Sequence, residues 1–308
     1  MSKNDSNNIS PKPFLKWAGG KTQLLNDIES YLPDHFESKC DKYFEPFVGG
    51  GAVFFHLITQ FNFDCVYLGD TNGDLILTYR VIQKNPEELI EVLEGLSKEY
   101  LGKSDECREK MFKDFRSGFN KIHCEGSKIP KNNHVEIASK MLFLNKTCFN
   151  GLYRVNKKGE FNVPFAHPKK PLICDKNNIL TVSDVLTDVK IKCADYSKSK
   201  KYIDEFSFVY MDPPYRPING KKSFEGYSKS DFNDDNQWEL AKFCEEIDKE
   251  NGAKFILNNS DPENYIEDDS FFKDLYKKFT IKKVYAKRYI NSNANKRGEI
   301  SELLVHNF

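Results

Sequence analysis

The residues best suited to chemistry form a short turn, Asp212-Pro213-Pro214-Tyr215, directly after the apolar run 206–211. The run predicts a buried strand, and ligands of open α/β sheets bind beyond the carboxyl ends of strands. Because proline has no backbone N–H, the turn offers a carboxylate and prolyl carbonyls without a competing donor. Such acceptors suit a substrate amino group, and Tyr215 offers a flat ring on which a base can stack. The alternative is a proline-rich turn with an incidental acid.

A glycine loop stands early in the chain, between a predicted strand at 43–47 and a predicted helix carrying Val53, Phe54 and Leu57. Its sequence is Phe47-Val48-Gly49-Gly50-Gly51, and glycines allow a ligand to approach the backbone closely. Asp70 follows about 20 residues later at the end of the predicted strand 65–69, where an acid can bind ribose hydroxyls. A nicotinamide site fits poorly, because the third glycine of its motif would fall at Phe54.

The segment Lys16 to Thr22 contains Gly-Lys-Thr, which hints at a phosphate loop. The first glycine of that motif would have to stand at Leu15, and no strand precedes the segment, so a phosphate loop is excluded. Trp17 and Lys21 remain candidate ligand contacts, with a helix N-terminus and a buried tryptophan as the alternative.

Basic residues gather in two stretches although the chain carries 46 basic and 46 acidic residues and has a net charge of zero. Residues 140–170 hold seven Lys or Arg and one acid, and residues 281–298 hold six and no acid. Segregated charge on a neutral chain is typical of a localised polyanion site, although an ordinary solvated surface is the alternative. Within the first stretch we predict a basic β-hairpin, a shape that fits the major groove of DNA, with the polar residues Asn150, Arg154, Lys157 and Lys158 in or beside it.

The order strand, glycine loop, helix, strand and acid predicts a parallel βαβ unit and hence an α/β fold. Residues 75–172 are predicted to be mostly helical with the hairpin near their end, and the α/β pattern resumes near residue 180. We therefore expect a disordered tail at 1–12, a catalytic domain formed by 13–74 and 173–308, and an inserted DNA target-recognition domain at 75–172. An exposed helix over 234–250 and a terminal strand pair at 284–289 and 303–306 complete the expected α/β domain.

Several classes of protein are excluded by composition. No apolar run approaches the roughly 20 residues of a membrane span, and the polar N-terminus lacks the core of a secretory signal. The eight cysteines show no C-x-x-C pairing and no histidine cluster, so neither a metal site nor a disulfide framework is expected. The sequence therefore predicts a cytoplasmic protein without a metal.

Taken in order, these motifs resemble the Dam family of adenine-specific DNA methyltransferases. The likeness spans about residues 13–306 and is strongest to the GATC-specific methylases of restriction-modification systems of the DpnII and MboI type. It rests on PFLKWAGGK (13–21), FEPFVGGGAVFF (44–55), GDTNGDLI (69–76), NKTCFNGLYRVNKKGEFNVPF (145–165), VYMDPPY (209–215) and ILNNSD (256–261). One departure is Phe165-Ala166-His167, where relatives often have Phe-Gly.

The resemblance implies a Rossmann-like fold that uses S-adenosylmethionine, with S-adenosylhomocysteine as product, and it implies roles for individual residues. The implied catalytic residues are Asp212, Pro213, Pro214 and Tyr215. The implied cofactor contacts are Trp17, Lys21, Phe47, Gly49, Gly51, Asp70 and Asp212. Lys16 and Arg154 would read guanines at opposite ends of GATC, and Phe149 would enter the stack when the adenine leaves. The other implied DNA contacts are Asn150, Lys157, Lys158 and Pro164.

The sequence thus predicts a bacterial or phage enzyme that methylates N6 of adenine in double-stranded GATC by base flipping and in-line displacement. We expect a monomer, with a cognate restriction endonuclease as a functional partner. An N4-cytosine methyltransferase would use the same turn, but the stretch 145–165 argues against it. A DNA-binding protein that has lost catalysis is a further alternative, opposed by the intact Asp212 and Tyr215.

Overall fold

The computed structural model describes residues 10–124, 133–216, 232–287 and 299–308. The chain forms two compact units, and we describe each by itself. Unit 1 comprises residues up to Gly20, then Gly49–Thr59 and Asn72–Ile191, and unit 2 comprises Lys21–Val48, Gln60–Thr71 and Lys192–Phe308. These boundaries differ from those of the catalytic and DNA target-recognition domains predicted from sequence. The functional assignment of those two domains stays a prediction.

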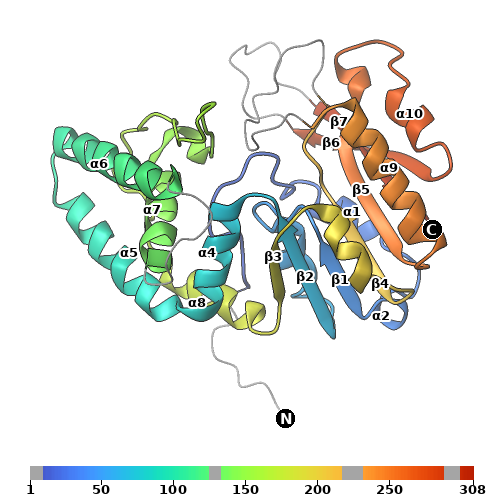
Figure 1. Ribbon diagram of the computed structural model, residues 1–308, viewed down its shortest axis with the longest axis horizontal. Coiled ribbons are helices and arrows are strands. Elements are labelled where there is room, and N and C mark those ends of the chain that lie inside the picture. The colour runs from blue at the N-terminus through green and yellow to red at the C-terminus, as the bar shows by residue number, and fades with distance from the viewer. Residues whose placement is uncertain (1–9, 125–132, 217–231, 288–298) are drawn as a thin grey trace. The chain divides into compact units, whose positions relative to one another are not determined.

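Seven strands of the described residues form one sheet in the order β3-β2-β1-β4-β5-β7-β6 (Figure 1). Strands β2, β1, β4 and β5 run parallel, whereas β7 runs antiparallel to both β5 and β6. From β1 the chain continues to β2 and β3 on one side, whereas β4 and the later strands lie on the other side of β1. The strand order therefore reverses between β1 and β4, and open α/β sheets bind ligands at the carboxyl ends of the strands at such a point. The bounds are β1 (Lys42–Glu45), β2 (Cys65–Asp70), β3 (Lys190–Cys193), β4 (Ser207–Met211), β5 (Lys254–Ser260), β6 (Thr280–Lys287) and β7 (Glu299–His306).

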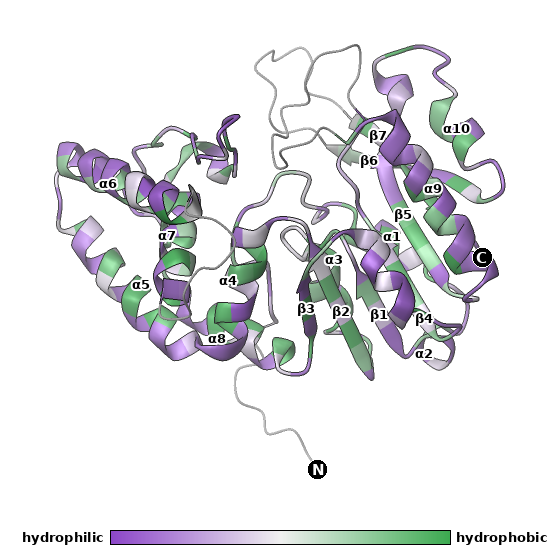
Figure 2. Cartoon of the chain, viewed as in Figure 1, coloured by the Kyte–Doolittle hydropathy of each residue, from purple (hydrophilic) through white to green (hydrophobic). Residues whose placement is uncertain are grey.

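The sheet of unit 2 is buried on both faces. Alternate residues of β1 and β4, such as Phe44 and Val209, pack with Leu240 and Phe243 of helix α9 (Asp234–Lys249) in one apolar core. The intervening residues face the other way, and Phe208 meets Phe36 of α2 (Phe36–Lys39) edge to face. Near-continuous apolar sequence follows from such two-sided burial, as Figure 2 shows along β2. The remaining elements of unit 2 are α1 (Leu25–Ser30), η3 (Tyr196–Tyr202), η4 (Pro262–Asn264) and α10 (Phe271–Leu275).

Unit 1 is helical. Its elements are α3 (Ala52–Leu57), α4 (Gly73–Lys84), α5 (Pro86–Leu101), α6 (Asp105–Cys124), α7 (His134–Thr147), η2 (Phe149–Gly151) and α8 (Lys176–Leu186). Local sequence sets the helix starts: Asn72 caps α4 by accepting a hydrogen bond from the Leu75 amide, and Pro86 opens α5. Figure 2 shows hydrophobic and hydrophilic stretches alternating along α5, as expected of a helix with one buried face.

The mixed α/β fold class predicted from sequence is confirmed, as is the basic hairpin. Asn162 donates its amide hydrogen to the Arg154 carbonyl, and Val155 pairs with Phe161 in an isolated bridge rather than in long strands. The helix at 234–250 is not simply exposed, because Leu240 and Phe243 are buried. Lys12, placed by the sequence in the tail, exchanges two hydrogen bonds with Asn178.

Three predictions concern residues that are only partly described. Residues 1–9 of the expected tail, residues 288–289 of the expected strand 284–289, and residues 288–298 of the second basic stretch lie outside the described residues. Within the described chain, no helix is both long and apolar enough to cross a membrane.

Candidate functional site

The acid-proline turn stands where the sequence placed it, directly after the fully buried strand β4. Pro213 is buried, and Asp212, Pro214 and Tyr215 are half-buried. The prolines were expected to leave their carbonyls facing outward. The carbonyl of Pro214 instead accepts a hydrogen bond from Nε2 of Gln237 on α9 at 3.2 Å. The turn is therefore held from within the fold at its second proline.

A buried lysine stands against this turn. The side chain of Lys21 is only 4% exposed, and its Nζ lies 2.8 Å from Oδ2 of Asp212 and 3.7 Å from Oε2 of Glu302. The same Nζ donates a hydrogen bond to the Tyr215 hydroxyl at 2.9 Å. Burial alone would lower the pKa of Lys21, but attraction to Asp212 and then to Glu302 outweighs it, so the pKa is raised. Lys21 is thus a permanent cation that stabilises the Asp212 carboxylate.

Further polar groups surround this ion pair in unit 2, and sequence reasoning gave none of them a role. Glu302 of β7 accepts a hydrogen bond from Nδ2 of Asn258 at 2.6 Å. Glu45, at the carboxyl end of β1, is 3% exposed and accepts from the Tyr43 hydroxyl at 2.7 Å. Burial and then the neighbouring Asp212 raise the pKa of Tyr210, so its phenol stays protonated. The carboxyl edge of β1 and β4, together with the amino-terminal half of the antiparallel strand β7, therefore holds a dense polar cluster.

Arg216 directly follows the turn in sequence and is held by two acidic side chains. Its guanidinium makes two hydrogen bonds to the Asp234 carboxylate, at 2.7 and 3.0 Å, and a third to Asp269 at 3.0 Å. The group also lies 4.0 Å from the centre of the Phe271 ring. Hydrogen bonds and attraction from Asp234 raise the pKa of Arg216, with burial opposing them. A forked cation with three fixed partners anchors the chain immediately after Tyr215.

The other predicted cofactor contacts of unit 2 lie at the ends of β1 and β2. Asp70 is the last residue of β2, and its carbonyl accepts a hydrogen bond from the Ala194 amide at 3.0 Å. Phe47 follows β1 and stacks on Tyr196, with 5.3 Å between ring centres. Both therefore stand at the carboxyl edge of the sheet, as predicted.

The glycine loop of unit 1 is shaped by two aromatic side chains. Gly49 and Gly51 have φ of +46° and +71°, a region that L side chains rarely adopt. A Cβ at Gly49 would lie 2.9 Å from the ring of Trp17, and one at Gly51 would lie 2.5 Å from the Tyr79 hydroxyl. Tyr79 also donates a hydrogen bond to the Gly49 carbonyl at 3.1 Å. Packing thus already requires glycine here, apart from any ligand.

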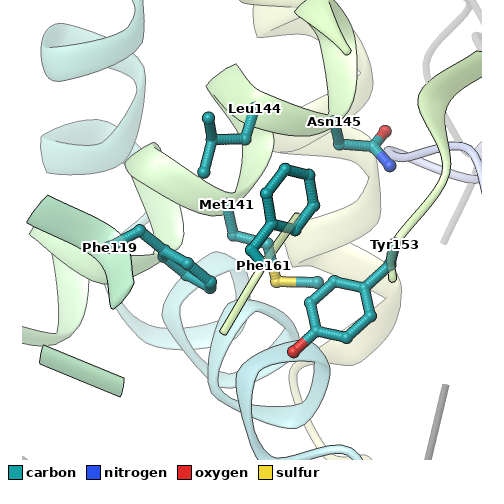
Figure 3. Close-up of a pocket in the computed structure, with 6 residues that line it drawn as sticks. All are labelled: Phe119, Met141, Leu144, Asn145, Tyr153 and Phe161. Carbon is teal, nitrogen blue, oxygen red and sulfur yellow. The ribbon is translucent and has the colours of Figure 1, made fainter. Parts of the chain in front are cut away.

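Trp17 is half-buried rather than fully buried, and it stacks on Tyr153 at the base of the hairpin with 5.5 Å between ring centres. The Tyr153 hydroxyl in turn donates to Oδ2 of Asp74 on α4 at 2.7 Å. Figure 3 shows Tyr153 and Phe161 of the hairpin beside Phe119 and Met141 of the helices, around a small apolar pocket. The hairpin is therefore fixed to the helical unit through its base.

Most of the predicted DNA contacts gather on this part of unit 1. Phe149 is 53% exposed, and its amide donates to the carbonyl of the exposed Pro164 at 2.9 Å. Exposed Asn150 has a φ of +56°, and the exposed Lys157 and Lys158 form the hairpin turn. Phe149 and Asn150 thus stand outward beside Pro164, with the two lysines at the hairpin turn.

The two predicted guanine readers are held by asparagines. Nε of Arg154 donates to Oδ1 of Asn162 at 2.7 Å, and Nη2 donates to the Asn162 carbonyl at 3.2 Å. Asn145, buried on α7, accepts from the Lys16 amide and donates to the carbonyls of Lys16 and Gly151. Lys16 itself is exposed, and a Cβ at Gly151 would lie 2.5 Å from the Cδ of its stem.

Comparison with known proteins decides what this arrangement belongs to. Residues 17–290 match the family described as the D12 class N6 adenine-specific DNA methyltransferases. The chain belongs to this family. The resemblance drawn from the motifs is confirmed, and the family's chemistry is adenine rather than cytosine methylation.

Curated relatives resemble this methyltransferase along nearly its whole length. Type II methyltransferase M.MjaIII of Methanocaldococcus jannaschii is 48% identical over 299 residues, which are 96% of this chain and 99% of that protein. Type II methyltransferase M1.LlaDCHI of Lactococcus lactis subsp. cremoris is 35% identical, covering 98% of this chain and 97% of that one. DNA adenine methylase of Escherichia coli K12 is 32% identical, covering 96% and 94%.

Membership makes the chain a DNA adenine N6-methyltransferase that acts on a DNA substrate, and the family implies S-adenosylmethionine as methyl donor. Within the described residues, no three His, Cys, Asp or Glu side chains converge as metal ligands would.

Proposed function

We propose that this methyltransferase modifies N6 of adenine in double-stranded GATC, and that Asp212, Pro213, Pro214 and Tyr215 form its catalytic turn. The observation that carries the proposal is the buried Lys21–Asp212 pair at 2.8 Å, fixed beside Tyr215 at the carboxyl edge of the sheet. A carboxylate held in place by a buried cation is a well-positioned acceptor for an amino group.

The residues of unit 2 fit the implied methyl donor. S-adenosylmethionine carries an amino-acid carboxylate, an ammonium group and ribose hydroxyls, and its sulfonium supplies an electrophilic methyl group when bound. Lys21 would bind the carboxylate and Asp70 the ribose hydroxyls, while Phe47 offers an apolar ring. A half-buried carboxylate such as that of Asp212 suits a cationic ligand. In unit 1, Trp17, Gly49 and Gly51 are proposed as further cofactor contacts on the strength of the sequence resemblance.

The turn can activate the adenine amino group by accepting its two N–H groups. That nitrogen is a poor nucleophile because its lone pair is delocalised into the ring. Hydrogen bonds to the Asp212 carboxylate and the Pro213 carbonyl would favour a more tetrahedral nitrogen with an available lone pair. Tyr215 would stack on the flipped base, offsetting about 1–3 kcal/mol of the cost of unstacking it. Methyl transfer by in-line displacement then depends largely on positioning.

The hairpin region of unit 1 is proposed to read the DNA. Lys16 and Arg154 would bond guanines at opposite ends of GATC, and Asn162 holds the Arg154 guanidinium in a defined orientation. Phe149, exposed and backed by Pro164, would fill the space left by the flipped adenine. Contacts of Asn150, Lys157, Lys158 and Pro164 with the duplex complete the proposed interface.

We further propose that the enzyme acts as a monomer and that its methylation protects DNA from a restriction endonuclease of the same specificity. Two relatives named Type II methyltransferases support this role. A monomer suffices because each strand of a palindrome can be methylated in a separate event.

The decisive experiment uses plasmid DNA from a methylation-deficient host, incubated with the protein and S-adenosylmethionine. The plasmid is then digested with one endonuclease blocked by adenine methylation in GATC and with another that requires it. Resistance to the first and cleavage by the second are expected. The opposite pattern would reject GATC as the site, and mass analysis of the nucleosides would then identify the modified base.

The role of Asp212 is tested by Asp212→Ala, with Asp235→Ala, which truncates an exposed acid on α9, as the matched control. We expect turnover to be lost in Asp212→Ala while duplex binding, measured by fluorescence anisotropy, stays largely intact. The control should keep full turnover. Near-normal methylation by Asp212→Ala would remove this residue from the mechanism.

A further inference from the structure

A chain of hydrogen bonds runs from strand β5 through helix α9 to the catalytic turn. The Ser260 amide donates to Oδ1 of Asn259 at 2.9 Å, and Nδ2 of Asn259 donates to Oε1 of Gln237 at 3.1 Å. Nε2 of Gln237 then donates to the carbonyl of Pro214 at 3.2 Å. All four residues belong to unit 2.

The direction of this chain is set at its first step. A backbone amide can only donate, so Oδ1 of Asn259 must face Ser260 and its NH₂ group must face Gln237. The NH₂ group of Gln237 is thereby aimed at Pro214. Both amides are enclosed, because Gln237 is 0% and Asn259 is 1% exposed. Donors and acceptors in such surroundings cannot exchange partners with water, and linked hydrogen bonds polarise one another.

The placement of Gln237 is not explained by packing. It precedes Leu240, Ala241 and Cys244 on the buried face of α9, where an apolar side chain would be expected. Asn259 likewise interrupts the buried face of β5 after Phe255 and Leu257. Two amides in apolar positions need a reason, and the carbonyl of Pro214 supplies one.

We infer that Gln237 is a positioning residue for methyl transfer, which acts through the Pro214 carbonyl and takes its orientation from Asn259. The inference rests on the proposed role of the turn. Prolines 213 and 214 have no amide hydrogen with which to tie the turn to the fold, so an outside donor must fix the peptide between Pro214 and Tyr215. That peptide sets the direction of Tyr215 and follows directly on the acceptor carbonyl of Pro213.

The test compares Gln237→Met and Gln237→Glu, which keep the shape of the side chain but lose its NH₂ donor. We expect kcat to fall about 10- to 100-fold in both, as small misplacements at a reacting centre do. The KM values for DNA and S-adenosylmethionine should change by less than about threefold. Deuterium exchange at the Tyr215 amide, which needs no activity, should become faster.

Asn259→Asp and the double variant test whether the chain acts as one device. The aspartate still accepts from Ser260 but cannot donate to Gln237, so kcat should fall as in the single Gln237 variants. Combined with Gln237→Met it should add little, because both substitutions cut the same chain. Fully additive losses would show two independent structural contacts and would overturn the inference.

Asn307→Leu is the matched control. Asn307 accepts from the Phe255 amide and donates to Asp248 and Ala253 at the opposite end of β5, far along the strand from the turn. The Asn307→Leu variant should be less stable than the wild type, but its kcat should be unchanged. Equal loss of kcat in Asn307→Leu and Gln237→Met, or unchanged kcat and Tyr215 exchange in the Gln237 variants, would overturn the proposal. If Gln237→Met does not fold, Gln237→Glu and Asn259→Asp carry the test.

A failure of the proposed function can be distinguished from a failure of the inference about Gln237. Wild-type protein that leaves GATC unmethylated, or Asp212→Ala that retains turnover, would contradict the proposed function, whereas the exchange rate of Tyr215 would still judge Gln237.

Discussion

Removing the buried cation should destabilise the protein far more than removing an exposed one. In Lys21→Met the carboxylates of Asp212 and Glu302, 19% and 14% exposed, lose this cation, although Glu302 keeps its hydrogen bond from Asn258. At 2.8 Å and an effective dielectric constant of about 20, the Lys21–Asp212 attraction is about 6 kcal/mol. The cost of burying the charges offsets part of this, and stranding a buried charge typically costs about 3–5 kcal/mol. We expect a loss of that size in the free energy of unfolding.

The loss should also depend on pH. The pKa of Lys21 is raised above its ordinary value of 10.5, so the stability that comes from this shift is fully present just below pH 10.5 and is lost as the pH rises through the raised pKa. Lys21→Met lacks this titrating group, so the difference in unfolding free energy between the two proteins should follow the titration of Lys21. The difference in unfolding free energy should therefore stay constant between about pH 8 and about pH 10 and should narrow as the pH rises above 10.5.

Urea denaturation of four proteins measures these losses in unfolding free energy: the wild type, Lys21→Met, Lys278→Met and Lys21→Met combined with Asp212→Asn. Lys278→Met, which breaks the pair of the 54% exposed Lys278 with Glu245, should cost at most about 1 kcal/mol. Adding Asp212→Asn to Lys21→Met should restore part of the stability, because one stranded charge is removed. Equal losses in Lys21→Met and Lys278→Met, or a difference in unfolding free energy that widens as the pH rises above about 10.5, would refute the reasoning.

Two further predictions concern unit 1. Arg154→Ala should cost about 1–3 kcal/mol of discrimination at one base pair, measured as kcat/KM on GATC against single-base variants of the site; the same loss on every sequence would make Arg154 a phosphate contact. Gly51→Ala should cost about 1–3 kcal/mol in unfolding free energy, because the new Cβ meets the Tyr79 hydroxyl at a φ of +71°. At Gly95 in α5 an added Cβ would have nothing within 4 Å, so Gly95→Ala should instead raise the free energy of unfolding by up to about 1 kcal/mol. A change in the same direction in both variants would contradict the steric argument.

The sequence predicted those parts of the fold whose signals are local. The strand before Asp212 and the basic hairpin each carry their cause within a few residues. Strand β3 was not predicted, because Lys190 and Lys192 alternate with Ile191 in a short edge strand that reads as a polar loop. The position of β7 between β5 and β6 has no local signal, because register across distant strands is fixed by packing.

The candidate site divides in the same way. Asp212 and Tyr215 were found because their turn is compact in sequence. Glu302 was missed because it meets Lys21 only through the sheet, with most of the chain between them. Gln237 had a signal that we did not use: an amide where the apolar face of α9 begins. A polar residue on the apolar face of a helix predicts a buried hydrogen-bond partner, but the sequence does not say which residue that partner is.

The place of β7 has a consequence for the order in which the protein can be assembled. Residues 299–306 are synthesised after both of the strands that they separate, so β5 and β6 stay apart until this last strand is inserted between them. Non-local pairing of this kind is slow to form and leaves strand edges open in the meantime. The inserted strand also carries Glu302, the second carboxylate beside Lys21. A growing chain therefore acquires the complete charge balance around Lys21 only when β7 has been made, and the polar cluster is among the last parts of the molecule to be completed.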